Sequence, residues 1–600
     1  MNDELIIRVC MGPGGIAAGG KAVLDSFQAS LSHHKVSAVL KEKCSAHKVG
    51  CLGLCARDVL VEIQNNGGKT VYQYVKPDMV ERIVTEHLLG GVAITEWLVD
   101  DAYKNFYGKQ IKVVLEDCGR FDPEDIEAYK AAGGYTATKK VLSSLTPEAV
   151  IEEIKASGLR GRGGAGFPTG LKWEFGRKSP GTEKYIICNA DEGDPGAFMD
   201  RAVIEGNPHT VIEGMIIGAY AIGASKGYVY IRAEYPLAVE RLKLAIKQAR
   251  EAGYLGKKMF GSEFSFDIII KLGAGAFVCG EETALIASIE GLRGMPRAKP
   301  PFPAQKGLWN KPTIINNVET FANIAPIIKK GAQWFASYGT EKSKGTKVFA
   351  LTGKVKNTGL IEVPMGITLR EIIYDIGGGI IDNKELKAVQ TGGPSGGCIP
   401  AEQLDIKVDY ESLAKVGSIV GSGGMIVLDS DNCMVNMAQY FLQFTKSESC
   451  GKCVPCRIGT KRLLEILTRI TEGKGRQGDI ELLESLSNDI RSSSLCGLGQ
   501  TAPNPVLSTI RYYRDEYEAH IRDKRCPAGV CKALISFAIL EKTCTGCTAC
   551  ARVCPTNAIL GEKKKPHTII QEKCIQCGTC FDTCKFKAIK KGPRLEAVKA

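Results

Sequence analysis

Two runs of cysteines between residues 544 and 584 have a spacing that suits iron. The sequence reads Cys544-x2-Cys547-x2-Cys550-x3-Cys554-Pro555, and the spacing returns as Cys574-x2-Cys577-x2-Cys580-x3-Cys584. Thiolates in this order hold [4Fe-4S] clusters, and the fourth cysteine of each run then serves the other cluster. The sequence therefore predicts two clusters with these ligands: Cys544, Cys547, Cys550 and Cys584 for one, and Cys574, Cys577, Cys580 and Cys554 for the other.

A third cysteine group precedes these runs. Cys450-Gly-Lys-Cys453-Val-Pro-Cys456 is followed by an amphipathic helical pattern, and Cys496 comes after two more helical segments. Three thiolates at this spacing can face one metal centre, and a distant fourth completes a [4Fe-4S] cluster. Zinc is the alternative, but three ligands in one turn of chain suit a cluster face better than a tetrahedral ion.

The stretch from Gly158 to Phe175 predicts a phosphate-binding loop. Gly161, Gly163 and Gly166 match the pattern GxGxxG, but residues 146–157 before it carry a helix start and helical spacing. The loop therefore runs between helices, which argues against a strand-first dinucleotide fingerprint. Glycines let the backbone approach a ligand, and free N–H groups at a helix start suit phosphate oxygens. The interleaved basic and aromatic residues argue against a flexible linker.

Polar side chains collect after apolar strands in the region that follows. Asn189, Asp191 and Glu192 follow one strand, and Glu281 and Glu282 follow another. Ligands gather at strand ends in α/β sheets, although such residues are also ordinary helix caps and turns. A proline turn displaying Lys299 and Phe302, and the segment Ile315-Asn-Asn-Val-Glu-Thr320, add further polar groups and a flat apolar surface. Together these are the groups that a flavin and a nicotinamide would need.

The first 90 residues read as a small α/β module with Cys10, Cys51 and Cys55 at strand ends. The module resembles the thioredoxin-like [2Fe-2S] ferredoxin domain, whose cluster takes two cysteines from an early loop and two from a CxxxC loop. Here Gly15 stands where the second cysteine is expected, and a cluster needs four ligands. Two alternatives stay open: Cys44 substitutes, or the domain has kept its fold and lost its cluster.

Other thiols and imidazoles lie outside these motifs. His520, Cys526, Cys531 and His567 offer a Cys2His2 zinc site, with chance burial as the alternative. The isolated cysteines are most simply small buried side chains; they are Cys118, Cys188, Cys279, Cys398 and Cys433.

Composition restricts the class of protein. The chain has 600 residues, 23 cysteines and a net charge of +12, and shows no secretion signal or membrane-spanning apolar run. We therefore expect a cytoplasmic protein without a membrane span, whose reduced cysteines hold metal or are buried. Part of the charge lies in the basic segment from Lys585, which we interpret as a solvated end and not as a nucleic-acid site.

From Cys118 onward the chain resembles the flavin- and NADH-binding subunit of respiratory complex I. It is more closely similar to the beta subunit of multimeric [FeFe] hydrogenases and NAD-dependent formate dehydrogenases. The motifs that carry the resemblance are GRGGAGFPTGLKW, CNADEGDPGAF, GEET, INNVET and SCGKCVPCR.

The resemblance implies roles for particular residues. The FMN site would comprise Gly161, Arg162, Gly163, Gly164, Ala165, Gly166, Lys172, Asn189, Asp191, Glu192, Gly280, Glu281, Asn316 and Asn317. Phe167, Phe175 and Phe302 would stack on the nucleotide, with polar contacts from Lys299 and Glu282. No side chain is expected to act as a general base, because the hydride chemistry belongs to FMN. The Cys450 cluster would take electrons from the flavin.

These patterns predict an α/β multidomain protein. Its expected parts are a thioredoxin-like [2Fe-2S]-type domain (1–90), a linker (91–140), an FMN- and NADH-binding α/β domain (141–345), a β-grasp-like module (346–432), a helical bundle with a [4Fe-4S] cluster (433–535) and a two-cluster ferredoxin domain (536–600).

The expected activity is electron transfer between NADH, or NADPH, and iron–sulfur clusters through FMN. The two-cluster tail suggests coupling to ferredoxin and electron bifurcation. Expected partners are a small thioredoxin-like [2Fe-2S] subunit, ferredoxin, and a large catalytic subunit of hydrogenase, formate dehydrogenase or other reductase type. The alternatives are a non-bifurcating NADH diaphorase subunit and an electron-wire scaffold without flavin catalysis.

Overall fold

The computed structural model describes residues 4–36, 43–65 and 68–593. The chain forms two compact units, each described by itself below. The first comprises Met1–Asn383, Gln390–Gly393 and Glu402–Val427, and the second comprises Lys384–Val389, Pro394–Ala401 and Leu428–Ala600. Among the helices of the described ranges, none is both long enough and apolar enough to cross a membrane.

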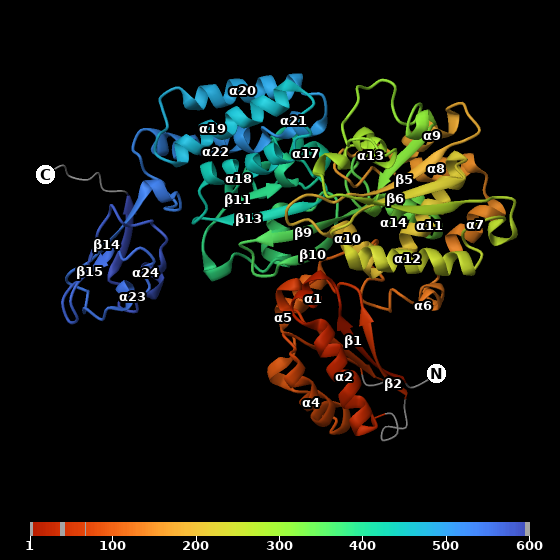
Figure 1. Cartoon of the computed structure of the whole chain (residues 1–600). Coiled ribbons are helices and arrows are strands. Elements are labelled where there is room, and N and C mark those ends of the chain that lie inside the picture. The colour runs from red at the N-terminus through yellow and green to blue at the C-terminus, as the bar shows by residue number, and fades with distance from the viewer. Residues whose placement is uncertain (1–3, 37–42, 66–67, 594–600) are drawn as a thin grey trace. The chain divides into compact units, whose positions relative to one another are not determined.

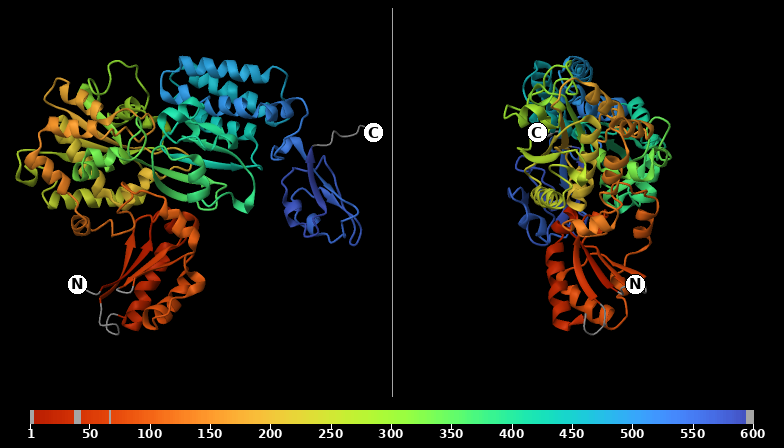
Figure 2. Two further views of the ribbon diagram at one scale, coloured as in Figure 1. Left: turned by 180° about the vertical axis from the view of Figure 1, so that it is seen from behind. Right: turned by 90° about the vertical axis from the view of Figure 1, so that its right-hand side faces the viewer.

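The first unit begins with a four-stranded sheet in the order β2-β1-β3-β4. Strand β1 (Glu4–Cys10) pairs in parallel with β2 (Lys43–Val49) and antiparallel with β3 (Val61–Asn65), which in turn pairs antiparallel with β4 (Gly68–Tyr72). Helix α2 (Gly20–His34) lies on one face, in front of the strands in Figure 1 and behind them in the reverse view of Figure 2. This arrangement agrees with the expected thioredoxin-like fold. Short helical segments complete the module: α1 (Pro13–Ala17), α4 (Val80–Arg82) and a π-helical turn (Ile83–Leu89).

Residues 91–140, expected to be a linker, contribute to the core of the first unit. They contain α5 (Asp101–Gly108), α6 (Ile126–Ala131) and the start of α7 (Thr136–Ser144). The buried carboxylate of Glu213 accepts hydrogen bonds from the Tyr129 hydroxyl at 2.6 Å and from the backbone N–H of Tyr135 at 2.9 Å. These bonds and the burial of both rings tie the segment to the next domain.

The central sheet of the first unit is parallel, with strand order β7-β6-β5-β8. Its strands are β5 (Tyr185–Ala190), β6 (Lys226–Arg232), β7 (Asp267–Gly273) and β8 (Thr313–Asn317). Helix α11 (Pro208–Ile222) is rich in apolar residues and is buried along nearly its whole length. The other helices are α8 (Pro147–Ala156), α9 (Thr169–Lys178), α10 (Met199–Gly206), α12 (Pro236–Glu251), α13 (Glu282–Ile289), α14 (Val318–Ala322), α15 (Ile324–Lys330) and α16 (Ala332–Ala336).

The β-grasp-like module follows in the first unit. Strand β9 (Thr346–Gly353) pairs antiparallel with β10 (Gly359–Pro364) and parallel with the first residues of β13 (Gly424–Asp429). A π-helical turn covers Glu371–Ile376, and α17 (Tyr410–Lys415) comes later.

The second unit is mostly helical before its ferredoxin-like end. After β11 (Leu386–Thr391), where the unit boundary falls, and β12 (Gly397–Pro400), it contains α18 (Met434–Ser447), α19 (Thr460–Thr471), α20 (Asp479–Ser493), α21 (Gly497–Thr501) and α22 (Asn504–Ile521). Leu463, Ile466, Leu467 and Ile470 of α19 are buried at helical spacing, so one face of α19 packs into the core of this unit.

The last module of the second unit is built from two similar halves. Strands β14 (Ile535–Ile539) and β17 (Ile589–Pro593) pair antiparallel, as do β15 (Ile559–Leu560) and β16 (Thr568–Ile569). A short helix follows the first cysteines of each run, α23 (Ala549–Arg552) and α24 (Thr579–Thr583). Cys550 and Cys580 are buried in the small core of the module.

Candidate functional site

The glycine loop joins two helices, α8 and α9. Its neck is closed by two backbone hydrogen bonds, from Gly161 N–H to the Phe167 carbonyl at 2.8 Å and from Thr169 N–H to the Leu159 carbonyl at 2.9 Å. Gly166 has a φ of 63°, a backbone conformation that favours glycine. The loop is therefore a closed bend immediately before the first turn of α9.

Arg162 stabilises this loop through its hydrogen bonds. Its buried guanidinium donates to the carbonyls of Thr346 at 2.9 Å, Arg160 at 3.0 Å and Lys344 at 2.6 Å. Its backbone N–H donates to Thr320 Oγ1 at 2.9 Å. Because the side chain is occupied by backbone carbonyls, Arg162 supports the loop and does not point its charge at a ligand.

Tyr410 supports the other side of the loop, and sequence reasoning missed it. Its hydroxyl donates to the Gly161 carbonyl at 2.8 Å, and its ring packs so closely on Gly166 that an added Cβ would lie 2.6 Å from a ring carbon. The Arg160 guanidinium stacks on the same ring at 4.2 Å from its centroid. Nothing near position 410 in the sequence signals this contact, since Tyr410 lies 249 residues from Gly161.

The loop rests on the carboxyl ends of the central strands. Asn189 and Asn317 are paired neighbours on β5 and β8, and a Cβ on Gly163 would lie 3.1 Å from Asn317 Cβ. Asn317 also caps α14 by accepting from Thr320 N–H at 3.0 Å. The Asn316 side chain accepts at 2.9 Å from the indole N–H of the buried Trp173 on α9. The amides are thus held in fixed orientations by their own hydrogen bonds.

Two acidic residues predicted for the site follow β5, and both are buried. Glu192 accepts backbone N–H hydrogen bonds from Asp200 at 3.1 Å and Arg201 at 3.2 Å, at the start of α10. Burial raises the pKa of Glu192 to about 7, although those two bonds oppose the shift. The Asp191 N–H donates to Asn189 Oδ1 at 3.1 Å. This turn therefore places a carboxyl group that titrates near neutrality beside the strand-end amides.

Two lysines form ion pairs with two glutamates at the next strand end. The Lys172 ammonium pairs with Glu282 and donates to the Ile315 carbonyl at 2.6 Å. Lys299 lies 2.8 Å from a Glu281 carboxylate oxygen and 3.8 Å from one of Glu282. Burial favours the neutral form of Glu282, but the charge and hydrogen bond of Lys172 together with the charge of Lys299 outweigh it and lower the pKa. Glu281 also caps α13 by accepting from Thr283 N–H at 2.9 Å.

Contacts between neighbouring elements connect several of these groups. Asn189 Nδ2 donates to the Gly280 carbonyl at 2.9 Å, which links the end of β5 to the start of α13. Phe167, Phe175 and Phe302 are 46%, 48% and 55% exposed, and the rings of Phe167 and Phe175 lie 6.5 Å apart. Exposed aromatic rings beside a glycine bend, oriented amides and two lysines fit a flat, phosphorylated ligand such as FMN with a nucleotide above it.

The Cys450 group is brought together by two helical segments of the second unit. Cys496 is the N-cap of α21, and a Cβ on Gly499 of that helix would lie 3.0 Å from Cys456 Cβ. Burial raises the pKa of the Cys456 thiol to about 11, and the neighbouring thiols of Cys453, Cys496 and Cys450 add to the rise. A set of four thiols from one turn and one distant helix start fits a [4Fe-4S] cluster.

The two cysteine runs of the last module line two separate cavities. Cys544, Cys547 and Cys550 line one cavity together with Cys584 of the second run. Cys574, Cys577 and Cys580 line the other together with Cys554 of the first run. This is the exchanged arrangement of the two-cluster pattern.

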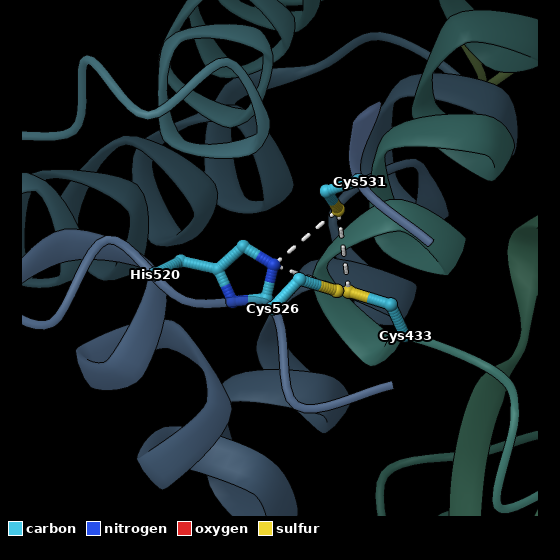
Figure 3. Close-up of side chains that lie close together, drawn as sticks. All are labelled: Cys433, His520, Cys526 and Cys531. Carbon is cyan, nitrogen blue, oxygen red and sulfur yellow. Dashed lines mark hydrogen bonds between the residues drawn. The ribbon is translucent and has the colours of Figure 1, made fainter. Parts of the chain in front are cut away.

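A buried quartet of Cys433, His520, Cys526 and Cys531 has all its ligand atoms within 4.8 Å of one another (Figure 3). His520 Nε2 lies 3.4 Å from Cys433 Sγ and 3.3 Å from Cys531 Sγ. Its Nδ1 lies 2.7 Å from the Glu516 carbonyl, which can only accept a hydrogen bond, so Nδ1 carries the proton and Nε2 faces the sulfurs. Three thiols and one imidazole in this space fit tetrahedral zinc.

This quartet corrects two expectations. The sequence groups His567 with His520, Cys526 and Cys531, but His567 lines the cavity of Cys544 instead. The sequence also favours Cys433 as an isolated buried cysteine, yet it supplies the fourth ligand position. The reason is topological: Cys433 precedes α18, which packs against α22, the helix that carries His520.

In the front module, Cys10 ends β1, and Cys51 and Cys55 lie in the loop after β2. Cys44 does not join them. In the parallel pairing of β1 with β2 it lies opposite Leu5, whereas Cys10 lies opposite Val49. About five residues of strand separate these two registers, which is about 16 Å. The position of its backbone therefore removes Cys44 as the fourth ligand; its side chain lies outside the described residues.

Comparisons with known proteins agree with this architecture. Residues 154–326 match the Nuo51 FMN-binding domain, 348–398 the SLBB domain, 436–520 the NADH-ubiquinone oxidoreductase-F iron-sulfur binding region, and 543–594 a 4Fe-4S dicluster domain.

Similar proteins extend over most of the chain. The NADP-reducing hydrogenase subunit HndC of Solidesulfovibrio fructosivorans is 62% identical over 483 residues, which is 80% of this chain and 98% of that protein. The F 2 subunit of the NADH-quinone oxidoreductase of Rhizobium meliloti is 47% identical over 415 residues, covering 69% and 99%. A crystal structure of NAD+-reducing [NiFe]-hydrogenase in the air-oxidized state aligns with a TM-score of 0.61 and 30% identity, over 87% of this chain and 86% of that one.

Proposed function

Because the chain belongs to the family of flavin-binding subunits that includes HndC and the F subunits of NADH-quinone oxidoreductase, we propose that it carries electrons between NAD(P)H and iron–sulfur clusters through FMN. It is an oxidoreductase of this flavin and iron–sulfur type. One observation carries the proposal: the glycine loop, the strand-end amides and the Lys172–Glu282 pair meet at the carboxyl edge of a parallel sheet. Ligands of α/β sheets bind at that edge.

FMN, when bound, supplies the exchange between two-electron hydride chemistry and one-electron transfer. Each part of the site then has a task. The bend from Gly161 to Gly166 brings backbone N–H groups close to the ligand, because its glycines have no side chain to keep the backbone away. Asn189 and Asn317 orient the ligand with amides whose positions are fixed by hydrogen bonds. Lys172, paired with Glu282, offers a cation whose charge is partly neutralised.

The exposed aromatic rings would bind the nicotinamide nucleotide. Phe167 and Phe175 lie beside the loop, and Phe302 follows the proline turn that carries Lys299. Aromatic faces in this position hold a planar ring by stacking. Lys299 and Glu282 would make the polar contacts to the nucleotide. The relatives' names include both NADP and NAD+, so flavin reduction should be measured with NADH and with NADPH.

Replacing Gly163 by valine tests the flavin site. Its Cβ would be 3.1 Å from Asn317 Cβ, and the two further methyl groups would enter the space against the strand ends. We expect loss of retained FMN, measured by released flavin per chain, with the cluster EPR signals unchanged. Gly108→Val is the matched control, because a Cβ there would meet nothing within 4 Å beyond its neighbouring residues and its own helix backbone. A flavin-replete Gly163→Val protein would exclude this site, and flavin-free wild-type protein would favour the electron-wire scaffold.

The metal complement follows from the cysteine sets. We assign three [4Fe-4S] clusters, one to the Cys450 set and one to each cavity of the last module, and zinc to the Cys433 quartet. The thiols give up their protons when they bind metal, and the fixed tautomer of His520 prepares its Nε2. These sites would pass electrons onward (iron) or join helices without redox change (zinc).

At the level of the assembly, we propose a multisubunit enzyme in which this chain couples NAD(P)H to ferredoxin by electron bifurcation. A large hydrogenase, formate dehydrogenase or other reductase subunit and a small thioredoxin-like [2Fe-2S] subunit would be its partners. Support comes from the names of the relatives and from the additional cluster module. The purified complex should oxidise NADH only when ferredoxin is also present. Steady turnover with a single acceptor would contradict bifurcation and leave the diaphorase alternative.

A further inference from the structure

Among the described residues, the front module brings three cysteines to one place. Cys10 and Cys51 are buried, Cys55 is partly buried, and the backbone of Cys44 is about 16 Å along the strands from Cys10. Position 15 holds glycine, and an added Cβ there would run into the carbonyl oxygen of Cys10. The backbone of α1 is therefore packed against Cys10 too tightly for a cysteine at position 15. A cluster in this module needs a ligand from another segment.

Asp58 lies beside the three cysteines and could supply the fourth ligand. It follows the short helical turn Cys55–Arg57, and after burial the nearby charge of Asp58 is the next cause that raises the pKa of the Cys10 thiol. The neighbouring Cys55 thiol and burial raise the pKa of the Cys51 thiol. The four side chains thus form two pairs, Cys10 with Asp58 and Cys51 with Cys55, and the charge of Asp58 also acts on Cys51. A cluster with two iron atoms needs two protein ligands at each iron.

Glycines of the early loop lie directly against these side chains. A Cβ on Gly14 would collide with Asp58 Oδ2 and would lie 3.1 Å from Cys55 Sγ. A Cβ on Gly12 would lie 2.5 Å from Cys51 Cβ. The early loop therefore approaches both ligand pairs with bare backbone, as a loop that closes over a bound group must do.

The spacing of the ligand atoms indicates whether a site suits a single metal ion or a cluster. Within the described residues, only the Cys433 quartet brings three or more ligand atoms within 4.8 Å of one another. The front set is more widely spaced, as are the cysteines assigned to [4Fe-4S] clusters. A single ion would need the compact spacing, whereas a cluster separates its ligands by its own iron and sulfide atoms.

We propose that Asp58 is the fourth ligand of a [2Fe-2S] cluster in the front module, sharing one iron with Cys10 while Cys51 and Cys55 hold the other. The carboxylate preserves the count of four anionic ligands. As a harder, less covalent donor than thiolate, it weakens sulfur-to-iron charge transfer at its iron. The inference does not depend on the flavin, so the flavin-free Gly163→Val protein should contain the same cluster.

The test uses the full chain, enriched in 57Fe and purified without oxygen. Mössbauer spectroscopy separates the ferric pair of an oxidised [2Fe-2S] cluster from [4Fe-4S] iron, and EPR of the reduced protein is recorded where the faster-relaxing [4Fe-4S] signals have broadened. Wild-type protein should hold about two irons per chain in such a pair. Asp58→Ala should lose that pair and keep its other iron. The exposed Asp25→Ala is the matched control and should keep both.

Asp58→Cys protects the test against misfolding of the alanine variant. It should retain the iron pair, with stronger charge-transfer absorption and altered g values, because the ligand set is then all sulfur. The proposal is overturned if wild-type protein has no iron pair, if Asp58→Ala retains the pair with an unchanged spectrum, or if Asp58→Cys retains it with the wild-type spectrum.

Discussion

Replacement of Arg162 by lysine would show how much of FMN binding depends on the support beneath the glycine loop. The buried guanidinium makes three hydrogen bonds to carbonyls of residues 160, 344 and 346. A lysine ammonium keeps the charge but lacks the planar fork, so it can satisfy about one of them. Hydrogen bonds to a charged group contribute about 1.5–3 kcal/mol each, and two are lost. We expect the free energy of unfolding of this domain to fall by roughly 3–6 kcal/mol.

Part of that cost should appear in ligand affinity. If reordering the loop consumes about 1.4 kcal/mol of binding free energy, the Kd for FMN rises about tenfold. The assay is reconstitution of flavin-free protein, followed by quenching of FMN fluorescence, alongside thermal unfolding. Arg177→Lys is the control, since Arg177 makes an exposed ion pair with Glu148. Wild-type FMN affinity and stability in Arg162→Lys would refute the reasoning.

Two further predictions concern the zinc quartet and a buried carboxyl group. Cys433→Ser should lose about one zinc per chain by metal analysis, whereas His567→Ala should keep it; the reverse result would restore His567 as a ligand. In flavin-free protein, stability should fall by up to about 3 kcal/mol as pH rises from 4.5 to about 7, because folded Glu192 binds its proton more tightly than the unfolded chain does. Thermal unfolding against pH measures this, and Glu192→Gln should flatten the profile. If the variant keeps the wild-type profile, a group other than Glu192 causes the pH dependence.

The sequence predicts best where ligands are close together in the chain. The cysteine runs from Cys544 and Cys574 can be interpreted from spacing alone, because one turn of backbone brings three thiols to one cluster face. The helical pattern before the glycine loop predicts that the loop lies between helices, and α8 and α9 bear this out. The order of modules is also predictable, because each has its own periodicity.

Non-local contacts were not predictable. Cys433 and Cys531 are 98 residues apart, and only the packing of α18 against α22 brings them together. Tyr410 carries no motif, yet it fixes the loop carbonyl of Gly161. The segment before residue 140 looks polar and glycine-bearing, but Glu213 binds it into the core. In each case the signal lies in a partner that sequence spacing does not reveal.

The exchange of Cys554 and Cys584 between the two cavities has a consequence for biosynthesis. When the growing chain has reached only the first run, it offers three thiols to one cavity and a single thiol to the other. Neither set is complete until Cys584 has been made and the second half has folded against the first. If each cavity holds a cluster, we expect iron and sulfide to be inserted after synthesis of this module and both clusters to be gained together.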